Sequence, residues 1–109
     1  MKYIFEVQIK EGFTAEEYAD AWVRASQLIQ RAPGAMGTEL LQKIGDENSL
    51  IAIATWHSKI ERDAMQAEHT FAIDKIIQSV APFVGIRPLG EFKEFREVVA
   101  SYADDDELS

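Results

Sequence analysis

Residues 50–56 read Leu-Ile-Ala-Ile-Ala-Thr-Trp, a short run with a polar turn before it and a helix start after it. Successive side chains of a β-strand point to opposite faces, and in this strand both faces are apolar. That pattern is typical of a strand whose two faces are both covered. The two faces carry Leu50, Ala52, Ala54 and Trp56 on one side, and Ile51, Ile53 and Thr55 on the other.

The segments on either side of this strand have their own signals. Turn-forming residues at 45–49 predict an antiparallel hairpin with a strand at 35–44. Ser58 with Glu61, and Thr14 with Glu17, have the form of capping boxes, in which each pair satisfies free backbone N–H groups at a helix start. We therefore expect one helix over 15–32 and another over 58–66.

The rest of the chain completes an α+β fold. Alternating residues at 3–9 predict a strand, and apolar residues spaced by three and four predict a further helical segment over 70–80. We expect 83–90, which contains Pro88, to be irregular, and 95–101 to form the last strand. The predicted order is β-α-β-β-α-β, a ferredoxin-like fold with a four-stranded antiparallel sheet. Residues 1–102 are expected to form this single domain, with 103–109 as an acidic tail.

The two apolar faces of residues 50–56 also predict a partner. Helices that follow the ferredoxin-like order cover only one face of the sheet, so the other face needs a cover from outside the chain. The simplest cover is a second copy, and we therefore expect a homodimer.

Charge and composition exclude several classes of protein. The 109 residues carry a formal net charge of −8, which is the wrong sign for nucleic-acid binding. The chain has no cysteine, so it forms no disulfide, and we expect a cytoplasmic protein. Since no apolar run reaches the roughly 20 residues that span a bilayer, no membrane association is expected. The acidic residues and the two histidines have no familiar metal-site spacing, so no metal is expected.

Three pieces of sequence together resemble a known family. They are the opening strand, a helix that ends in Pro33-Gly34 before Ala-Met-Gly-Thr-Glu-Leu-Leu, and Ala-Thr-Trp-His-Ser-Lys at 54–59. Over roughly residues 1–71 they are similar to the dimeric α/β-barrel proteins that include antibiotic-biosynthesis, quinol and haem-degrading monooxygenases. The resemblance implies two sheets packed face to face in a dimer, and a pocket between the sheet and the helices of each subunit. It further implies oxidation of a small aromatic or quinol-like compound by molecular oxygen, without a cofactor.

Haem is disfavoured by the same resemblance. The haem-degrading branch carries an asparagine in the first strand, a tryptophan in the second helical segment and a histidine further along. By register, those positions hold Val7, Met65 and Lys75 in this chain. Because none of the three matches, haem degradation by that mechanism is not expected.

Few residues are candidates for the site. His69 is the candidate catalytic base, since an unperturbed imidazole titrates near pH 6.5. Trp56, Phe71, Tyr3 and Trp22 are the candidate pocket residues, although each aromatic side chain also has a simpler role as core filler. Two alternatives to the monooxygenase stay open: a non-catalytic small-ligand-binding dimer of the same fold, and a haem-binding protein with altered ligation.

Overall fold

The computed structural model describes residues 1–68 and 71–101, and it confirms the ferredoxin-like α+β fold. Four strands form one antiparallel sheet in the order β2-β3-β1-β4, with three α-helices and one 3₁₀ turn between them. The elements are β1 (Lys2–Ile9), α1 (Ala15–Ile29), β2 (Ala35–Lys43), β3 (Asp46–Trp56), α2 (Lys59–Ala67), α3 (Phe71–Val80), η1 (Ala81–Phe83) and β4 (Val84–Phe92).

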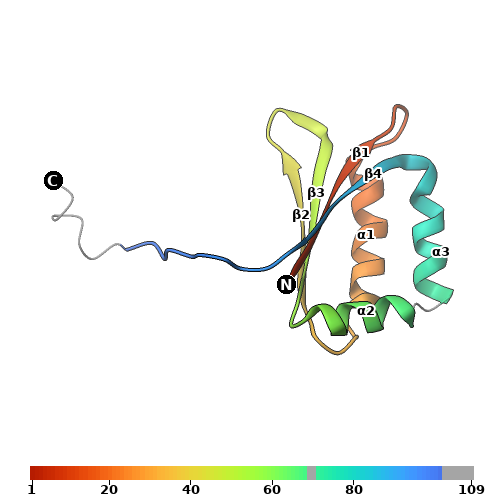
Figure 1. The fold of residues 1–109 in the computed structure, drawn as a ribbon. Coiled ribbons are helices and arrows are strands. Elements are labelled where there is room, and N and C mark those ends of the chain that lie inside the picture. The colour runs from red at the N-terminus through yellow and green to blue at the C-terminus, as the bar shows by residue number, and fades with distance from the viewer. Residues whose placement is uncertain (69–70, 102–109) are drawn as a thin grey trace, which may run out of the picture.

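The helices lie on one face of the sheet (Figure 1). α1 and α3 run along that face and pack against each other, whereas α2 lies across their end. The inner side of β1 contributes Val7 and Ile9 to the core, where they join Tyr18 of α1, Leu50 of β3 and Val84 of β4. No part of the described chain covers the outer face of the sheet.

Both predicted capping boxes are present. Thr14 Oγ1 accepts a hydrogen bond from the backbone N–H of Glu17 at 3.2 Å, and Ser58 Oγ accepts one from Glu61 at 3.2 Å. The first cap starts α1 beside the core, and the second turns the chain from the end of β3 into α2. These local bonds satisfy backbone donors that the first helical turn otherwise leaves free.

The start of α2 is also fixed from the end of α1. The Glu61 carboxylate lies 2.7 Å from Nδ1 of His57, whose backbone N–H donates to the Gly34 carbonyl at 2.8 Å. Gly34 has a φ of 87°, and a Cβ at this position would collide with the Glu61 side chain. Glycine is therefore required where the chain leaves α1, and it lets α2 approach the beginning of β2.

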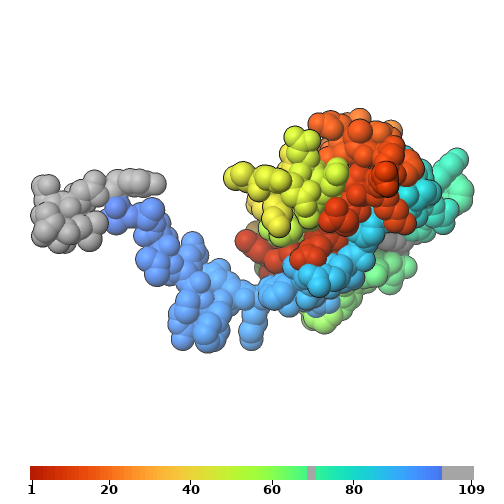
Figure 2. All heavy atoms as spheres, turned by 90° about the horizontal axis from the view of Figure 1, so that it is seen from above, coloured from red at the N-terminus to blue at the C-terminus, as the bar shows by residue number. Residues whose placement is uncertain are grey.

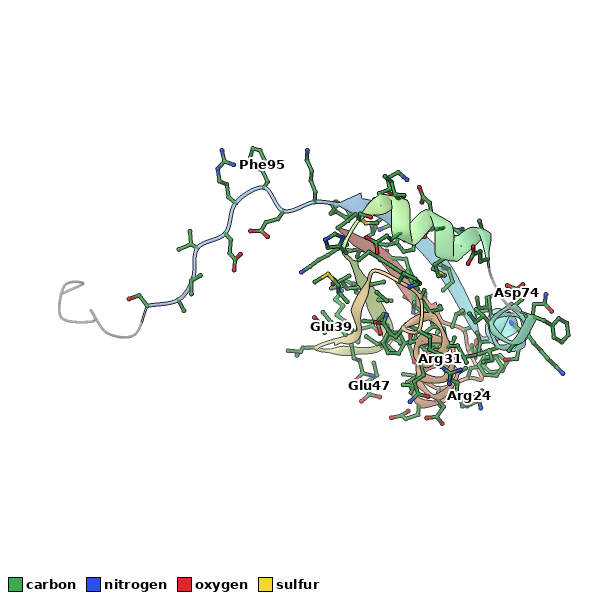
Figure 3. The ribbon with its side chains drawn as sticks, turned by 90° about the horizontal axis from the view of Figure 1, so that it is seen from below. Arg24, Arg31, Glu39, Glu47, Asp74 and Phe95 are labelled. Carbon is green, nitrogen blue, oxygen red and sulfur yellow. The ribbon has the colours of Figure 1, made fainter. Side chains whose placement is uncertain are left out.

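The last strand was misplaced by the sequence prediction. β4 is Val84–Phe92, so most of it lies in the region 83–90 that was expected to be irregular, while 93–101 form no helix or strand. Pro88 is tolerated because β4 is an edge strand of the sheet. The neighbouring residues Ile4 and Phe5 of β1 pair with Gly90 and Pro88, so β4 has one extra residue at this point, which forms a β-bulge. Residues 93–101 extend away from the body, with Phe95 projecting from them (Figures 2 and 3).

The hairpin is tighter than expected. Only Ile44 and Gly45 form the turn, so β3 begins at Asp46 and not at residue 50. Gly45 has a φ of 94°, the left-handed conformation that two-residue hairpin turns require. The polar residues at 46–49 therefore pair as strand, although their types are common in turns.

Candidate functional site

A cavity of about 530 Å³ lies between the inner face of the sheet and the helices. It exists because small side chains face each other across this layer. α1 contributes Ala21 and Ala25, and β3 contributes Ala52 and Ala54. Its walls are mainly apolar, and its volume is within the range of about 300 to 1,000 Å³ that is usual for small-molecule sites.

Three of the predicted pocket residues meet at this cavity. Trp56 is 2% exposed and lines it from the end of β3. The end of β3 is held by backbone pairing with the N-terminus, since the Trp56 N–H donates to the Met1 carbonyl at 2.8 Å and the Met1 amino group donates to the Trp56 carbonyl at 2.9 Å. Tyr3 of β1 and Trp22 of α1 also line the cavity.

The other two predicted residues are placed differently. Phe71 begins α3, is 80% exposed and is not part of the cavity wall. His69 lies outside the described residues, so its role as a base stays a prediction. His57, the other histidine, lies 2.7 Å from Glu61 and does not line the cavity.

Tyr18 is a polar group of the cavity that the prediction did not include among the site residues. Its side chain is 5% exposed, it lines the cavity, and no described residue hydrogen-bonds to its hydroxyl. Burial raises the pKa of Tyr18 to about 12, because the ionised phenolate would lose its hydration. The hydroxyl therefore stays protonated at neutral pH and is available to donate a hydrogen bond to a ligand.

Arg62 of α2 was also missed. Its side chain is 14% exposed, and its guanidinium carbon lies 4.3 Å from the centre of the Tyr3 ring. Nη1 lies 3.4 Å from a Glu91 oxygen and 3.5 Å from an Asp63 oxygen. The arginine is thereby held over the aromatic end of the cavity, whose wall it joins.

Among residues 1–68 and 71–101, no group of three or more histidine, aspartate or glutamate side chains could hold a metal ion. Of the three positions that correspond by register to the haem-degrading branch, Val7 is buried in the core and Lys75 is exposed. Met65 does line the cavity, but the described lining contains no histidine.

The family is shown by comparison with known sequences. A sequence model of the antibiotic biosynthesis monooxygenase family matches residues 2–71, which include β1, the helices α1 and α2, and the hairpin between them. The chain belongs to the antibiotic biosynthesis monooxygenase family. No curated protein sequence matches it significantly.

Solved structures agree on the fold at low sequence identity. SnoaB, a cofactor-independent oxygenase from Streptomyces nogalater, superposes with a TM-score of 0.78 at 15% identity, covering 89% of this chain and 94% of SnoaB. A protein from Nitrosomonas europaea assigned to the same family gives 0.70 at 16% identity, covering 87% and 100%. Rv0793 from Mycobacterium tuberculosis gives 0.62 at 11% identity, covering 85% and 96%.

Within residues 1–68 and 71–101, no helix has both the length and the apolar character needed to cross a bilayer.

Proposed function

We propose that this protein is a monooxygenase that binds a small aromatic or quinol-like compound in the cavity and oxidises it with molecular oxygen, without a cofactor of its own. The observation that supports this most is an apolar cavity with a buried, protonated tyrosine hydroxyl, in a chain of the monooxygenase family. The description of SnoaB as a cofactor-independent oxygenase favours the same chemistry.

In this reaction the substrate supplies the electrons. The substrate as a whole loses two hydrogens and gains one oxygen atom at the reacting carbon, while the second oxygen atom leaves as water. The protein would hold the ring between Trp22 and Trp56 and exclude bulk water. Tyr18 would donate a hydrogen bond to a ring oxygen, and His69 is the proposed base that accepts the proton from the substrate.

Oxygen uptake with a panel of hydroquinones tests the proposal. We expect enzyme-dependent uptake above autoxidation, and incorporation of one labelled atom from ¹⁸O₂ into the product by mass spectrometry. Binding without uptake across the panel would contradict catalysis and would favour the non-catalytic ligand-binding dimer.

The two histidines provide a matched pair of variants for the proposed base. His69→Ala should lower kcat roughly 100-fold or more, as expected for loss of a general base. His57→Ala should retain kcat, because His57 is 76% exposed and does not line the cavity. Equal activity of both variants and the wild type would exclude His69 as the base.

We also propose that the functional unit is a homodimer formed through the outer face of the sheet. Ile4, Leu41, Ile51 and Ile53 lie on that face by their register, and helices cover only the opposite one. A second copy would bury these apolar side chains, which otherwise contact water.

A further inference from the structure

Arg62 is distinguished by its charge and position. Of the described residues that line the cavity, it alone carries a charged side chain. Its backbone N–H donates to the Ser58 carbonyl at 3.2 Å in the first turn of α2, so the capping box fixes where the side chain begins. Only 14% of the side chain is exposed, although arginine usually extends into solvent.

The guanidinium is held in place but has spare donors. Its ion pairs, to Glu91 and Asp63, both use Nη1, at 3.4 and 3.5 Å. No described residue hydrogen-bonds to Nη2 or Nε. Because a guanidinium carries five N–H donors in a rigid plane, a group in the cavity can bind the remaining ones without displacing the carboxylates.

Lys59 shares the same acidic partners. Its Nζ lies 3.1 Å from an Asp63 oxygen and 3.1 Å from a Glu91 oxygen. Lys59 is 60% exposed and does not line the cavity. Lys59 therefore shares with Arg62 the compensation of these two carboxylates.

We propose that Arg62 determines substrate specificity by binding an ionised oxygen, a phenolate or carboxylate, on the aromatic compound in the cavity. This inference rests on the proposed function and names its substrate class. A phenolate would meet a fixed positive charge in a largely apolar site, where such an interaction is stronger than in water. Ionisation also makes a phenol a better electron donor, which oxidation by molecular oxygen requires.

An optical titration tests the proposal directly. The probe is 4-nitro-1-naphthol, whose phenolate absorbs in the visible, kept at a pH where the free probe is mostly protonated. Adding wild-type protein should produce a saturable phenolate band, because a cation within about 4 to 6 Å lowers the pKa of the bound phenol by about one unit or more. Arg62→Gln should lose this band and bind the ionised probe about tenfold more weakly.

Lys59→Gln is the matched control. It removes the same charge from the same ionic cluster, but from a side chain outside the cavity wall. We expect it to keep the phenolate band within about twofold of the wild type, because an exposed charge is screened by solvent. An equal loss in both variants would attribute the band to the general field of the cluster and overturn the specific role. An unchanged band in Arg62→Gln would overturn it as well.

A neutral analogue separates this proposal from the proposed function. 1-Nitronaphthalene should quench the fluorescence of the wild type and of Arg62→Gln equally, since both tryptophans of the chain line the cavity. Quenching without a phenolate band would refute the role of Arg62 alone. A phenolate band without oxygen uptake would refute the oxidation alone, and the absence of any binding would refute both.

Discussion

The two faces of β3 differ in the size of their side chains more than in their polarity. The inner face, which lies toward the helices, has a large side chain at each end, Leu50 and Trp56, and two small ones, Ala52 and Ala54, between them. The outer face carries Ile51 and Ile53 and faces no element of the described chain. The smaller side chains thus lie where the fold is covered, and they leave a cavity there. Side-chain size therefore distinguishes the face that leaves a cavity from the face that carries larger apolar side chains without a cover.

The largest effect on stability is expected at Trp56, at the end of the inner face of β3. Trp56→Ala should lower the free energy of unfolding by about 3 to 5 kcal/mol, because it removes a fully buried aromatic side chain. Thr55→Ala, one residue earlier on the outer face, should cost about 1 kcal/mol or less. Urea unfolding followed by circular dichroism measures both values.

If Trp56→Ala does not fold, Trp56→Phe provides the same comparison at lower cost, about 1 to 2 kcal/mol. Equal costs at residues 55 and 56 would show that the inner face is not the packed one.

The next effect concerns Tyr18 and alkaline pH. Burial raises the pKa of Tyr18 from its ordinary value of 10.0 to about 12 in the folded protein. Between these two values the unfolded chain binds fewer protons than the folded one, so the free energy of unfolding falls as the pH rises, by about 2 to 3 kcal/mol in total. The stabilising contribution is complete below pH 10 and is lost at about 12.

Tyr18→Phe isolates the contribution of Tyr18 ionisation to the free energy of unfolding, since all other groups that titrate at alkaline pH remain in the variant. The difference in unfolding free energy between wild type and variant should change across that window and stay constant at lower pH. A constant difference throughout would mean that the hydroxyl is solvated and does not report on a dry cavity.

The features that can be predicted from the sequence are those that depend on residues close together along the chain. The caps at Thr14 and Ser58 and the alternation of β1 are local, and all were found. β4 was missed because Pro88 argues against a strand unless the strand lies at an edge with a bulge, which only the completed sheet shows.

The same distinction applies to the site. Trp56, Tyr3 and Trp22 were identified from the resemblance and from apolar periodicity, and they do line the cavity. The position of Arg62 in the helical pattern of α2 is equally typical of a residue exposed to solvent, so the sequence does not reveal its burial. Its burial depends on Tyr3 and Glu91, which are distant in sequence and approach only when α2 crosses the end of the sheet.

A smaller effect on stability is expected from filling the cavity. Ala54→Leu adds carbon atoms at the cavity wall and should cost about 1 kcal/mol, while it weakens binding of 1-nitronaphthalene roughly tenfold. Thr55→Leu makes a similar side chain on the outer face and should leave binding unchanged. Quenching of tryptophan fluorescence measures both. Unchanged binding in Ala54→Leu would place the aromatic ligand elsewhere.

The smallest effect on the fold of one chain is expected at the outer face. Ile51 is 37% exposed when the chain is alone, so Ile51→Glu should change the stability of a single subunit by only about 0.5 kcal/mol. In the proposed homodimer the same change would bury a charge without a partner, and the subunits should separate.

Light scattering after gel filtration should therefore show a dimer for the wild type and a monomer for the variant. The unfolding midpoint should depend on protein concentration only in the wild type. A wild-type monomer at every concentration would show that the outer face, although apolar, is not an interface between two copies, and a variant that stays dimeric would place the interface elsewhere.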